Sequence, residues 1–443
     1  MNFSSITFLL WFLPLFCGLY WIAPRKLKNI LLLLGSLFFY AWGDFGSLWL
    51  LAATVCIDYV LGLLLERVHG ARLQKAVLWF GILLHLGVLV VCKVSGSLPL
   101  GVSFYTFHAL SFLIDVARGD SRAPKNPIKV GLYLCLFPKL IMGPIVPYSD
   151  LERELDSRTA APEDIAAGIF RFCIGLGKKV VLASTLAGLS AAWKDAANSV
   201  LSAWLGLLGF SLQLYFDFSG YSDMAVGLGR MFGFHLPENF RYPYLAGSLS
   251  EFWRRWHISL GSWFKKYLYF PLGGSRKGTV RTLLNLLIVW LATGIWHGTG
   301  WQFVLWGLYF GVLICLEKQW KLHEILPAWL RHILCPLLVM LGWVLFNSAD
   351  LPSALCYFSA LFGGTAAAVN AAARLYLHDF RLILPVSILG ATPLPAMVFS
   401  RIFPDRRPVL RAVSQAVFCL AVLAASFLLL ANSTYSPFLY AKF

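Results

Sequence analysis

The run Leu283-Leu-Asn-Leu-Leu-Ile-Val-Trp-Leu-Ala-Thr-Gly-Ile-Trp-His-Gly-Thr-Gly-Trp301 decides the fold class. It is apolar over most of the length that a helix needs to cross a bilayer, about 20 residues. Similar runs recur at about residues 4–23, 28–43, 47–66, 76–94, 128–147, 165–190, 201–230, 281–297, 300–317, 328–347, 380–400 and 410–431. Since a backbone in lipid must satisfy its own hydrogen bonds, we expect an all-α polytopic membrane protein with roughly 10–13 transmembrane helices.

The composition agrees with a chain that uses the bilayer as its solvent. Of the 443 residues, 59% are apolar and 13% are charged, against about a quarter charged in soluble domains. The mean hydropathy is +0.71. The runs are too long and too uniformly apolar for the alternating strands of a membrane barrel. No polar stretch is long enough for a soluble domain, so we expect one membrane domain over residues 1–443.

The net charge of +16 has a topological explanation. The basic residues cluster in short breaks between apolar runs, which indicates cytosolic loops rather than nucleic-acid binding. These breaks are Arg25–Lys28, Arg67–Lys75, Arg118–Lys129, Arg254–Arg281, Lys318–Lys321 and Arg401–Arg411. No charged residue precedes the first apolar run. We therefore expect a cytoplasmic (inner) membrane protein with both termini outside the cytosol.

The block from Glu251 to Gly274 departs from a simple span. Apolar residues recur there at three- and four-residue spacing, which predicts one basic amphipathic helix that lies along the membrane interface or dips into it. The stripe comprises Trp253, Trp256, His257, Leu260, Trp263, Phe264, Tyr267 and Leu268, while Arg254, Arg255, Lys265 and Lys266 lie off it. Pro271 ends the helix, before a turn and the pair Arg276-Lys277. The basic face suits either a substrate's phosphates or ordinary contact with anionic headgroups.

Two histidines are candidates for catalysis. His297 ends an apolar helix and is followed by Gly298 and Gly300. An ionisable group at membrane depth is costly, and imidazole is the side chain best suited to moving protons near neutral pH. The alternative for His297 is a helix-capping interfacial residue. His257 lies on the apolar stripe, where a satisfied core histidine is the alternative.

Other polar residues in apolar surroundings belong to Phe216-Asp-Phe-Ser-Gly-Tyr-Ser-Asp223. They could line a water-filled cavity, but hydrogen bonding between helices is the favoured interpretation. We count Asp217, Tyr221, Asn285 and Trp296 as supporting residues. The sequence has no Gly-x-Ser-x-Gly, no Walker loop, no His-Glu-x-x-His and no Cys-x-x-Cys. We therefore predict no metal site and no serine hydrolase, which leaves histidine acid–base chemistry.

Several segments together resemble the membrane-bound O-acyltransferase family, and its alginate O-acetyltransferase-like subgroup in particular. The two histidine motifs are Trp253-Arg-Arg-Trp-His-Ile-Ser-Leu-Gly-Ser-Trp-Phe264 and Trp296-His-Gly298. Further matches are Tyr267-Leu-Tyr-Phe-Pro-Leu-Gly-Gly-Ser-Arg-Lys-Gly278, Gly101–Phe107, Asp115–Gly119, Phe137–Pro144, Gly175–Lys179 and Asp217–Asp223. The resemblance implies a ring of helices, with interfacial or re-entrant helices, around a central tunnel.

The resemblance also implies a chemistry. His297 corresponds to the family's catalytic histidine and His257 to its partner. The implied donor is cytosolic acetyl-coenzyme A, a co-substrate rather than a bound cofactor. Its phosphates would be held by basic residues of the block, namely Arg254, Arg255, Lys265, Lys266, Arg276 and Lys277. The implied acceptor is an extracytoplasmic polysaccharide, reached through a periplasmic or secreted SGNH-type acetyltransferase.

The C-terminal tail, residues 438–443, has the pattern Phe-x-Tyr-x-x-Phe. Relatives in polysaccharide acylation systems end similarly, which makes Tyr440 a candidate acyl carrier. The alternative is an aromatic anchor at the membrane interface. Two rival functions remain at this point: a transporter or flippase of a glycan precursor, and a D-alanyl transferase of the teichoic-acid type. The built-in tail argues against the second, which normally relies on a separate small protein for the tyrosine.

Overall fold

The computed structural model describes residues 1–321 and 325–432. Within these residues the regular structure is helical, apart from an isolated bridge between Phe240 and Trp256. Six helices are long and apolar enough to cross a membrane, or seven if α20 (Ile383–Gly390) and α21 (Leu394–Ile402), bent by 79°, count as one span. The chain is therefore an all-α polytopic membrane protein, as the sequence predicts.

By this measure the spans in the described part are fewer than the roughly 10–13 predicted, in part because some apolar runs are broken. The run at 128–147 is one of these. It divides into α6 (Pro127–Cys135) and α7 (Phe137–Leu140) at Leu136, which has φ −52° and ψ 108°. Pro138 has no N–H to donate to the carbonyl four residues earlier, and its ring would clash with that carbonyl, so a continuous helix is disfavoured here. The freed N–H of Phe137 donates instead to Ser36 Oγ at 3.1 Å.

The described residues form two compact units, residues 1–172 with 221–238 and residues 173–220 with 239–443. The helices α9 (Pro162–Leu176) and α11 (Val200–Met231) contribute residues to both. The first unit otherwise contains a π-helical turn (Phe8–Phe12), α1 (Leu13–Ile22), α2 (Arg25–Gly43), α3 (Leu48–Arg67), α4 (Ala71–Val94), α5 (Val102–Arg118), α6, α7 and α8 (Tyr148–Asp156). The single domain over 1–443 stays a prediction.

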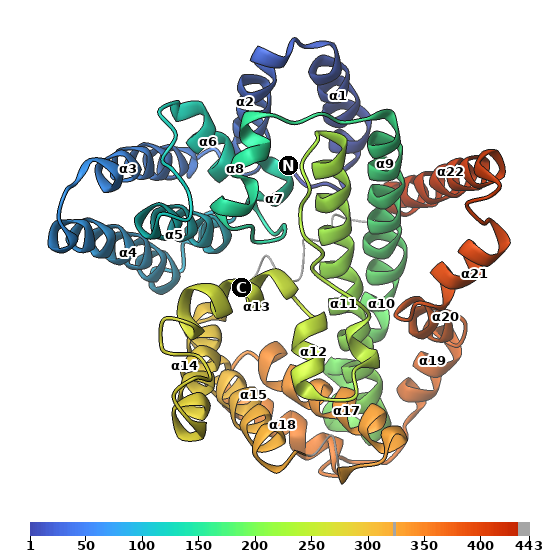
Figure 1. Ribbon diagram of the computed structural model, residues 1–443. Coiled ribbons are helices and arrows are strands. Elements are labelled where there is room, and N and C mark those ends of the chain that lie inside the picture. The colour runs from blue at the N-terminus through green and yellow to red at the C-terminus, as the bar shows by residue number, and fades with distance from the viewer. Residues whose placement is uncertain (322–324, 433–443) are drawn as a thin grey trace. The chain divides into compact units, whose positions relative to one another are not determined.

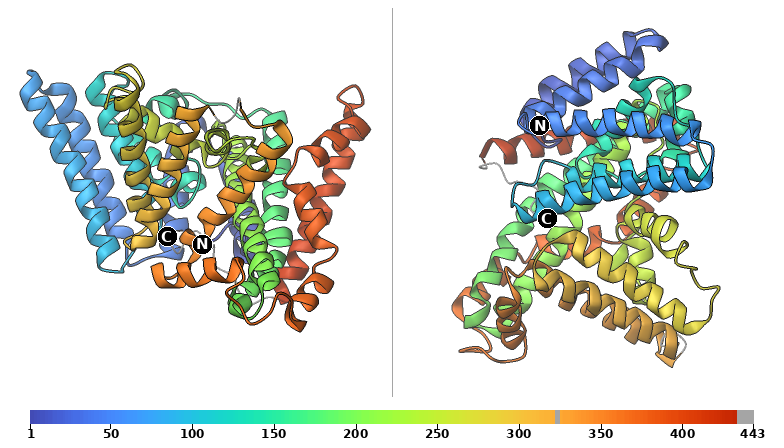
Figure 2. Two further views of the ribbon diagram at one scale, coloured as in Figure 1. Left: turned by 90° about the horizontal axis from the view of Figure 1, so that it is seen from below. Right: turned by 90° about the vertical axis from the view of Figure 1, so that its left-hand side faces the viewer.

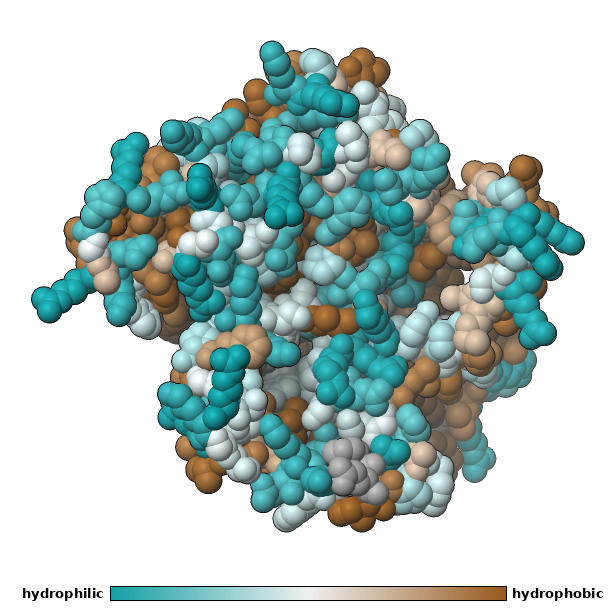
Figure 3. All heavy atoms as spheres, in the orientation of Figure 1, coloured by the Kyte–Doolittle hydropathy of each residue, from teal (hydrophilic) through white to brown (hydrophobic). Residues whose placement is uncertain are grey.

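In the first unit, α3, α4 and α5 pack against one another (Figure 1). Glycines allow the close contact: a Cβ atom on Gly62 would lie 2.7 Å from the Phe112 ring, and one on Gly81 would lie 2.5 Å from Leu113. A buried polar contact of 2.7 Å links Asp58 of α3 to His85 of α4. The helices α3 and α4 expose large hydrophobic side chains, as lipid contact requires, and hydrophobic spheres lie between and behind hydrophilic ones at this edge (Figure 3).

The second unit is built around a helical hairpin, α14 (Thr279–His297) and α15 (Trp301–Trp320) (Figures 1 and 2). A Cβ atom on Gly307 would lie 2.5 Å from Trp290 O, and one on Gly294 would lie 2.4 Å from Phe303 O. The two backbones therefore touch, as in other membrane helix pairs with small residues at the interface. The remaining elements are a π-helical turn (Gly177–Ala183), α10 (Ser184–Ser190), two 3₁₀ turns (Ala191–Asn198 and Pro243–Leu245), α12 (Leu249–Arg255), α13 (Ile258–Phe264), a second π-helical turn (Lys265–Tyr269), α17 (Ala328–Asn347), α18 (Leu351–Leu361), α19 (Ala371–Asp379), α20, α21 and α22 (Pro408–Asn432).

Candidate active site

A cavity of about 460 Å³ lies within the second unit, and both candidate histidines line it. Its walls are mainly aromatic and aliphatic, which suits a site that keeps bulk water away from the reacting groups. The lining residues are Trp253, Arg254, Trp256, His257, Leu260, Gly261, Phe264, Lys265, Tyr269, Leu286, Val289, Trp290, Thr293, His297, Trp306, Lys318 and Trp343. They come from α12, α13, the π-helical turn, α14, α15 and α17.

His297 is the last residue of α14, and its side chain is buried. Its ring centroid lies 5.0 Å from that of Trp306 and 5.2 Å from that of Phe346, both at edge-on angles. A Cβ atom on Gly298 would lie 2.3 Å from the Phe303 ring, so a larger residue at this position would require that ring to move. The contact between α14 and α15 and these rings together fix the direction of the imidazole.

His257 lies in a break between two helices, which corrects the prediction of one continuous amphipathic helix. The helix α12 ends at Arg255 and α13 begins at Ile258. His257 itself has φ +46°, a left-handed conformation that is uncommon outside glycine. Non-glycine residues held there cost about 1–3 kcal/mol and are frequent at functional sites.

The segment after α11 stabilises this break. Arg241 N–H donates to Arg255 O at 2.9 Å, and Ile258 N–H donates to Asn239 O at 3.0 Å. The Asn239 side chain completes the arrangement, because its Oδ1 accepts from Ser259 N at 3.1 Å and from Ser259 Oγ at 2.9 Å. These bonds replace helical hydrogen bonds that the break removes. Sequence reasoning missed Asn239.

The same Asn239 oxygen lies 3.1 Å from His257 Nδ1. A carbonyl oxygen accepts hydrogen bonds, so this contact places the ring proton on Nδ1 and leaves the lone pair of the neutral ring on Nε2. His257 lies outside the candidate spans. Burial lowers its pKa to about 3, so the ring is neutral at physiological pH. The Phe218 ring packs edge-on against it, with centroids 4.7 Å apart.

The basic residues predicted to hold phosphates divide into two groups. Arg254 and Lys265 line the cavity, and Lys318, in the last turn of α15, joins them although the sequence did not single it out. The other predicted residues are not among those that line it in the described structure. Arg255 pairs with Glu251, and Lys266 lies 5.1 Å from the centroid of the Tyr267 ring. Arg276 and Lys277 are exposed in the turn before α14.

Part of this division arises because the helix changes type at Lys265. Phe270 N–H donates to Lys265 O at 3.1 Å, five residues back, as in a π-helix. The wider turn alters the angular spacing that the amphipathic pattern assumes. Tyr269, which lies off the predicted stripe, therefore lines the cavity.

The supporting residues contact the site indirectly or belong elsewhere. Trp296 packs beside His297, with ring centroids 4.6 Å apart. Asn285 Nδ2 donates to Gly274 O at 3.0 Å and so holds the glycine turn before α14. Asp217 pairs with the buried Lys179. Tyr221, in the first unit, stacks on Phe3. Tyr440 lies outside the described residues, so its role stays a prediction.

The cavity therefore combines a proton acceptor with cations in apolar surroundings. A buried imidazole such as that of His297 can remove a proton from a hydroxyl group, while Arg254, Lys265 and Lys318 can hold an anionic substrate. A hydroxyl group that loses its proton in this way becomes a nucleophile, and it could then attack an activated carbonyl compound.

Comparison with known proteins identifies one family model and several relatives of this chain. The sequence model of the membrane-bound O-acyltransferase family matches residues 36–343. The chain is 36% identical to a probable alginate O-acetylase of Azotobacter vinelandii, with 100% of both chains covered. It is 41% identical to a probable alginate O-acetylase of Pseudomonas fluorescens, over 82% of this chain and 76% of the relative. It is 33% identical to a peptidoglycan O-acetyltransferase of Helicobacter pylori, over 82% and 80% respectively.

We predict that Asn239→Ala lowers both stability and turnover. Removing the amide leaves the Ser259 donors without their acceptor, which costs about 1–3 kcal/mol of unfolding free energy. The His257 ring also loses its partner at Nδ1. Thermal unfolding and turnover of the purified chain measure both effects, with Asn198→Ala, at an exposed position, as the control. Wild-type behaviour of Asn239→Ala would show that the break does not depend on this side chain.

Proposed function

Because the chain belongs to the membrane-bound O-acyltransferase family, we propose that it transfers acetyl from cytosolic acetyl-coenzyme A for O-acetylation of an extracytoplasmic polysaccharide. Membership makes it an O-acyltransferase enzyme. The observation that carries the finer proposal is the cavity that His257, His297 and three basic residues line together. Alginate is the first acceptor to test, because two of the relatives named above act on it by name, and peptidoglycan is the second.

In the proposed reaction His297 acts as general base. A nitrogen of its imidazole takes the proton of the acceptor hydroxyl while the oxygen forms a bond to the thioester carbonyl carbon. The tetrahedral intermediate collapses with loss of the coenzyme A thiolate, which recovers the proton from the imidazolium. His257, which its neighbours hold neutral, orients the reacting groups. Aromatic walls limit hydrolysis of the thioester.

Arg254, Lys265 and Lys318 bind the phosphates of coenzyme A in this proposal. These three residues come from α12, the π-helical turn and α15, and each lines the cavity. They belong to basic breaks that the positive-inside pattern assigns to the cytosol, where acetyl-coenzyme A is made available. The protein is accordingly proposed to lie in the cytoplasmic (inner) membrane with both termini outside the cytosol.

The acceptor side of the proposal involves Tyr440. Its phenol takes the acetyl group as an ester, and a periplasmic SGNH-type acetyltransferase then moves the group to the polymer. A phenol is a weak nucleophile until a base removes its proton, which His297 supplies. The support is the Phe-x-Tyr-x-x-Phe pattern at 438–443.

We expect His297→Ala to reduce acetyl transfer by about 10²–10⁴-fold, the usual contribution of a general base. Membranes are supplied with radiolabelled acetyl-coenzyme A, and label on the polymer or the protein is counted. His378→Gln is the control, since His378 is exposed and paired with Asp379. Undiminished transfer by His297→Ala would exclude it as the base.

Lys318→Gln should raise KM for acetyl-coenzyme A about tenfold and leave KM for acetyl-pantetheine unchanged, because only the first substrate carries phosphates. Lys266→Gln, in the same basic block but outside the cavity lining, should change neither. An equal effect of Lys318→Gln on both donors would mean that Lys318 shapes the cavity rather than binding phosphate.

If Tyr440 is the carrier, intact mass spectrometry of the full chain given acetyl-coenzyme A will detect one hydroxylamine-labile acetyl group. Tyr440→Phe should lack it, and Tyr435→Phe, which alters another C-terminal tyrosine, should retain it. Retention of the labile group by Tyr440→Phe would remove the carrier step and leave transfer by His297 intact.

A further inference from the structure

A second cavity, of about 610 Å³, lies within the first unit and has a polar lining. The start of α2 contributes Arg25, Lys28 and Asn29, and the end of α8 with the following loop contributes residues 154 and 156–159. The loop after α11 completes it with Gly233 and His235. None of these residues lines the cavity of the two catalytic histidines.

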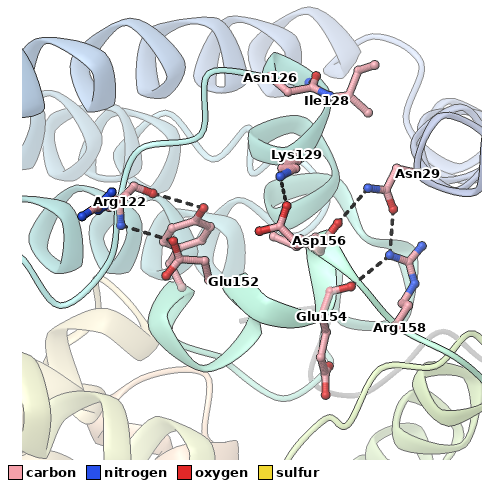
Figure 4. A network of polar contacts seen from close by, with 11 residues as sticks. Asn29, Arg122, Asn126, Ile128, Lys129, Glu152, Glu154, Asp156 and Arg158 are labelled. Carbon is pink, nitrogen blue, oxygen red and sulfur yellow. Dashed lines mark hydrogen bonds and ion pairs between the residues drawn. The ribbon is translucent and has the colours of Figure 1, made fainter. Parts of the chain in front are cut away.

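Arg158 is the fixed centre of this cavity. Its Nε donates to Tyr20 Oη at 3.2 Å and to Phe232 O at 3.1 Å. Its Nη1 donates to Asn29 Oδ1 at 2.7 Å and to Glu154 O at 3.1 Å (Figure 4). Nη2 is buried and has no hydrogen-bond partner among the residues that the structure describes. The guanidinium is thus held by these hydrogen bonds and by the Phe234 ring, whose centroid lies 4.2 Å from its Cζ atom. None of these partners is a carboxylate, so the positive charge of Arg158 is not neutralised by them.

The two carboxylates that line the cavity, Glu154 and Asp156, already have hydrogen-bond or ion-pair partners. Both Glu154 oxygens bind His235, at 3.0 Å to its backbone N and 2.7 Å to its Nδ1. Asp156 pairs with Lys129 (Figure 4). Within residues 1–321 and 325–432, neither Arg25 nor Lys28 is paired with a carboxylate. An excess of positive charge therefore remains at Arg25, Lys28 and Arg158.

The first turn of α2 adds to this positive potential. It contains no acidic residue, and no side chain caps its N-terminus. Basic residues in a first turn oppose the helix dipole, whereas an anion bound there would favour it. The N-terminus of α2, the guanidinium of Arg158 and the ammonium of Lys28 would therefore all attract an anion to this cavity.

The apolar neighbours of the cavity indicate what carries that anion. The turn from α1 to α2 exposes Ile22 by 87% and Leu27 by 47%, directly beside Arg25 and Lys28 in the chain. Trp21 is 40% exposed and donates from Nε1 to Met231 O at 3.4 Å. Tryptophan and basic residues at the end of an apolar helix mark the headgroup level of a bilayer. A soluble phosphate would make no contact with the exposed Ile22 and Leu27, whereas the acyl chains of a lipid would cover them.

We infer that this cavity binds the phosphate of an anionic glycerophospholipid, with the lipid's acyl chains along Ile22 and Leu27. The site is independent of the acyl-transfer proposal, because it shares no lining residue with the catalytic cavity. Lipid bound here ties the α1–α2 turn to α8 and to the loop after α11, so the first unit is stabilised by lipids of this charge.

Native mass spectrometry of the full detergent-solubilised chain tests the inference with short-chain phosphatidylglycerol as the probe. Lys28→Gln should weaken its binding severalfold, because each basic residue near an anionic lipid contributes about a fivefold factor. Lys26→Gln is the matched control, since Lys26 lies in the same helical turn, is exposed and is not among the residues that line the cavity. Wild type should retain phosphatidylglycerol in preference to phosphatidylcholine, and the lipid should raise its thermal unfolding midpoint.

Three results would overturn the assignment. Equal weakening by Lys26→Gln and Lys28→Gln would mean diffuse attraction to anionic lipid. Equal retention of phosphatidylcholine would mean that the headgroup charge is not recognised. Displacement of phosphatidylglycerol by an equal concentration of glycerol 1-phosphate would identify a soluble phosphate as the ligand. Thermal unfolding of each variant without lipid shows whether the substitution itself disturbs the fold.

Discussion

A backbone N–H or C=O group that is buried away from water must find a partner within the protein, and the site depends on how this constraint is met at one helix break. Between α12 and α13 the helical hydrogen bonds stop at Trp256 and His257. The segment 239–241 supplies the missing partners through two backbone bonds and the Asn239 side chain. Without such partners the break would be too costly in apolar surroundings. With them, His257 can keep a left-handed conformation that turns its ring into the cavity.

A second close contact places the other histidine by a different means. Here the helix continues unbroken to His297, and the neighbouring helix approaches until the two backbones touch at Gly294 and Gly307. Leucine-like side chains gain nothing from leaving lipid for another helix, so packing of small residues and rings must hold the pair together. The ring contacts of Trp306 and Phe346 then limit the rotation of the imidazole. The hydrogen bond to Asn239 thus helps to position His257, and ring contacts help to position His297.

The sequence could predict the fold class, and it singled out the two histidines that line the cavity, whose catalytic roles stay predictions. Long apolar runs indicate helices in lipid, and an ionisable residue at the end of such a run is rare enough to be noticed. The described residues contain fewer long apolar helices than hydropathy predicts, in part because hydropathy does not detect the bend at Leu136. The break at His257 was missed for a related reason, since the apolar stripe continues through it in helical spacing. Only the remote Asn239 makes that break possible, and a local pattern cannot reveal a partner 18 residues away.

The basic residues show more clearly that a local sequence pattern does not reveal the partners of a side chain. Arg254 and Arg255 are neighbours in one motif, yet Arg254 lines the cavity while Arg255 is neutralised by Glu251 four residues earlier. Lys265 also lines the cavity, whereas the neighbouring Lys266 lies over the Tyr267 ring. A cation is available to an anionic ligand when the fold directs it into a cavity and leaves it without a carboxylate. The sequence shows which residues carry positive charge, but only the folded structure shows which of them are paired with a carboxylate. That distinction separates Lys28 from Lys129 in the first unit as it separates Arg254 from Arg255 in the second, although all four lie in breaks that sequence alone would treat alike.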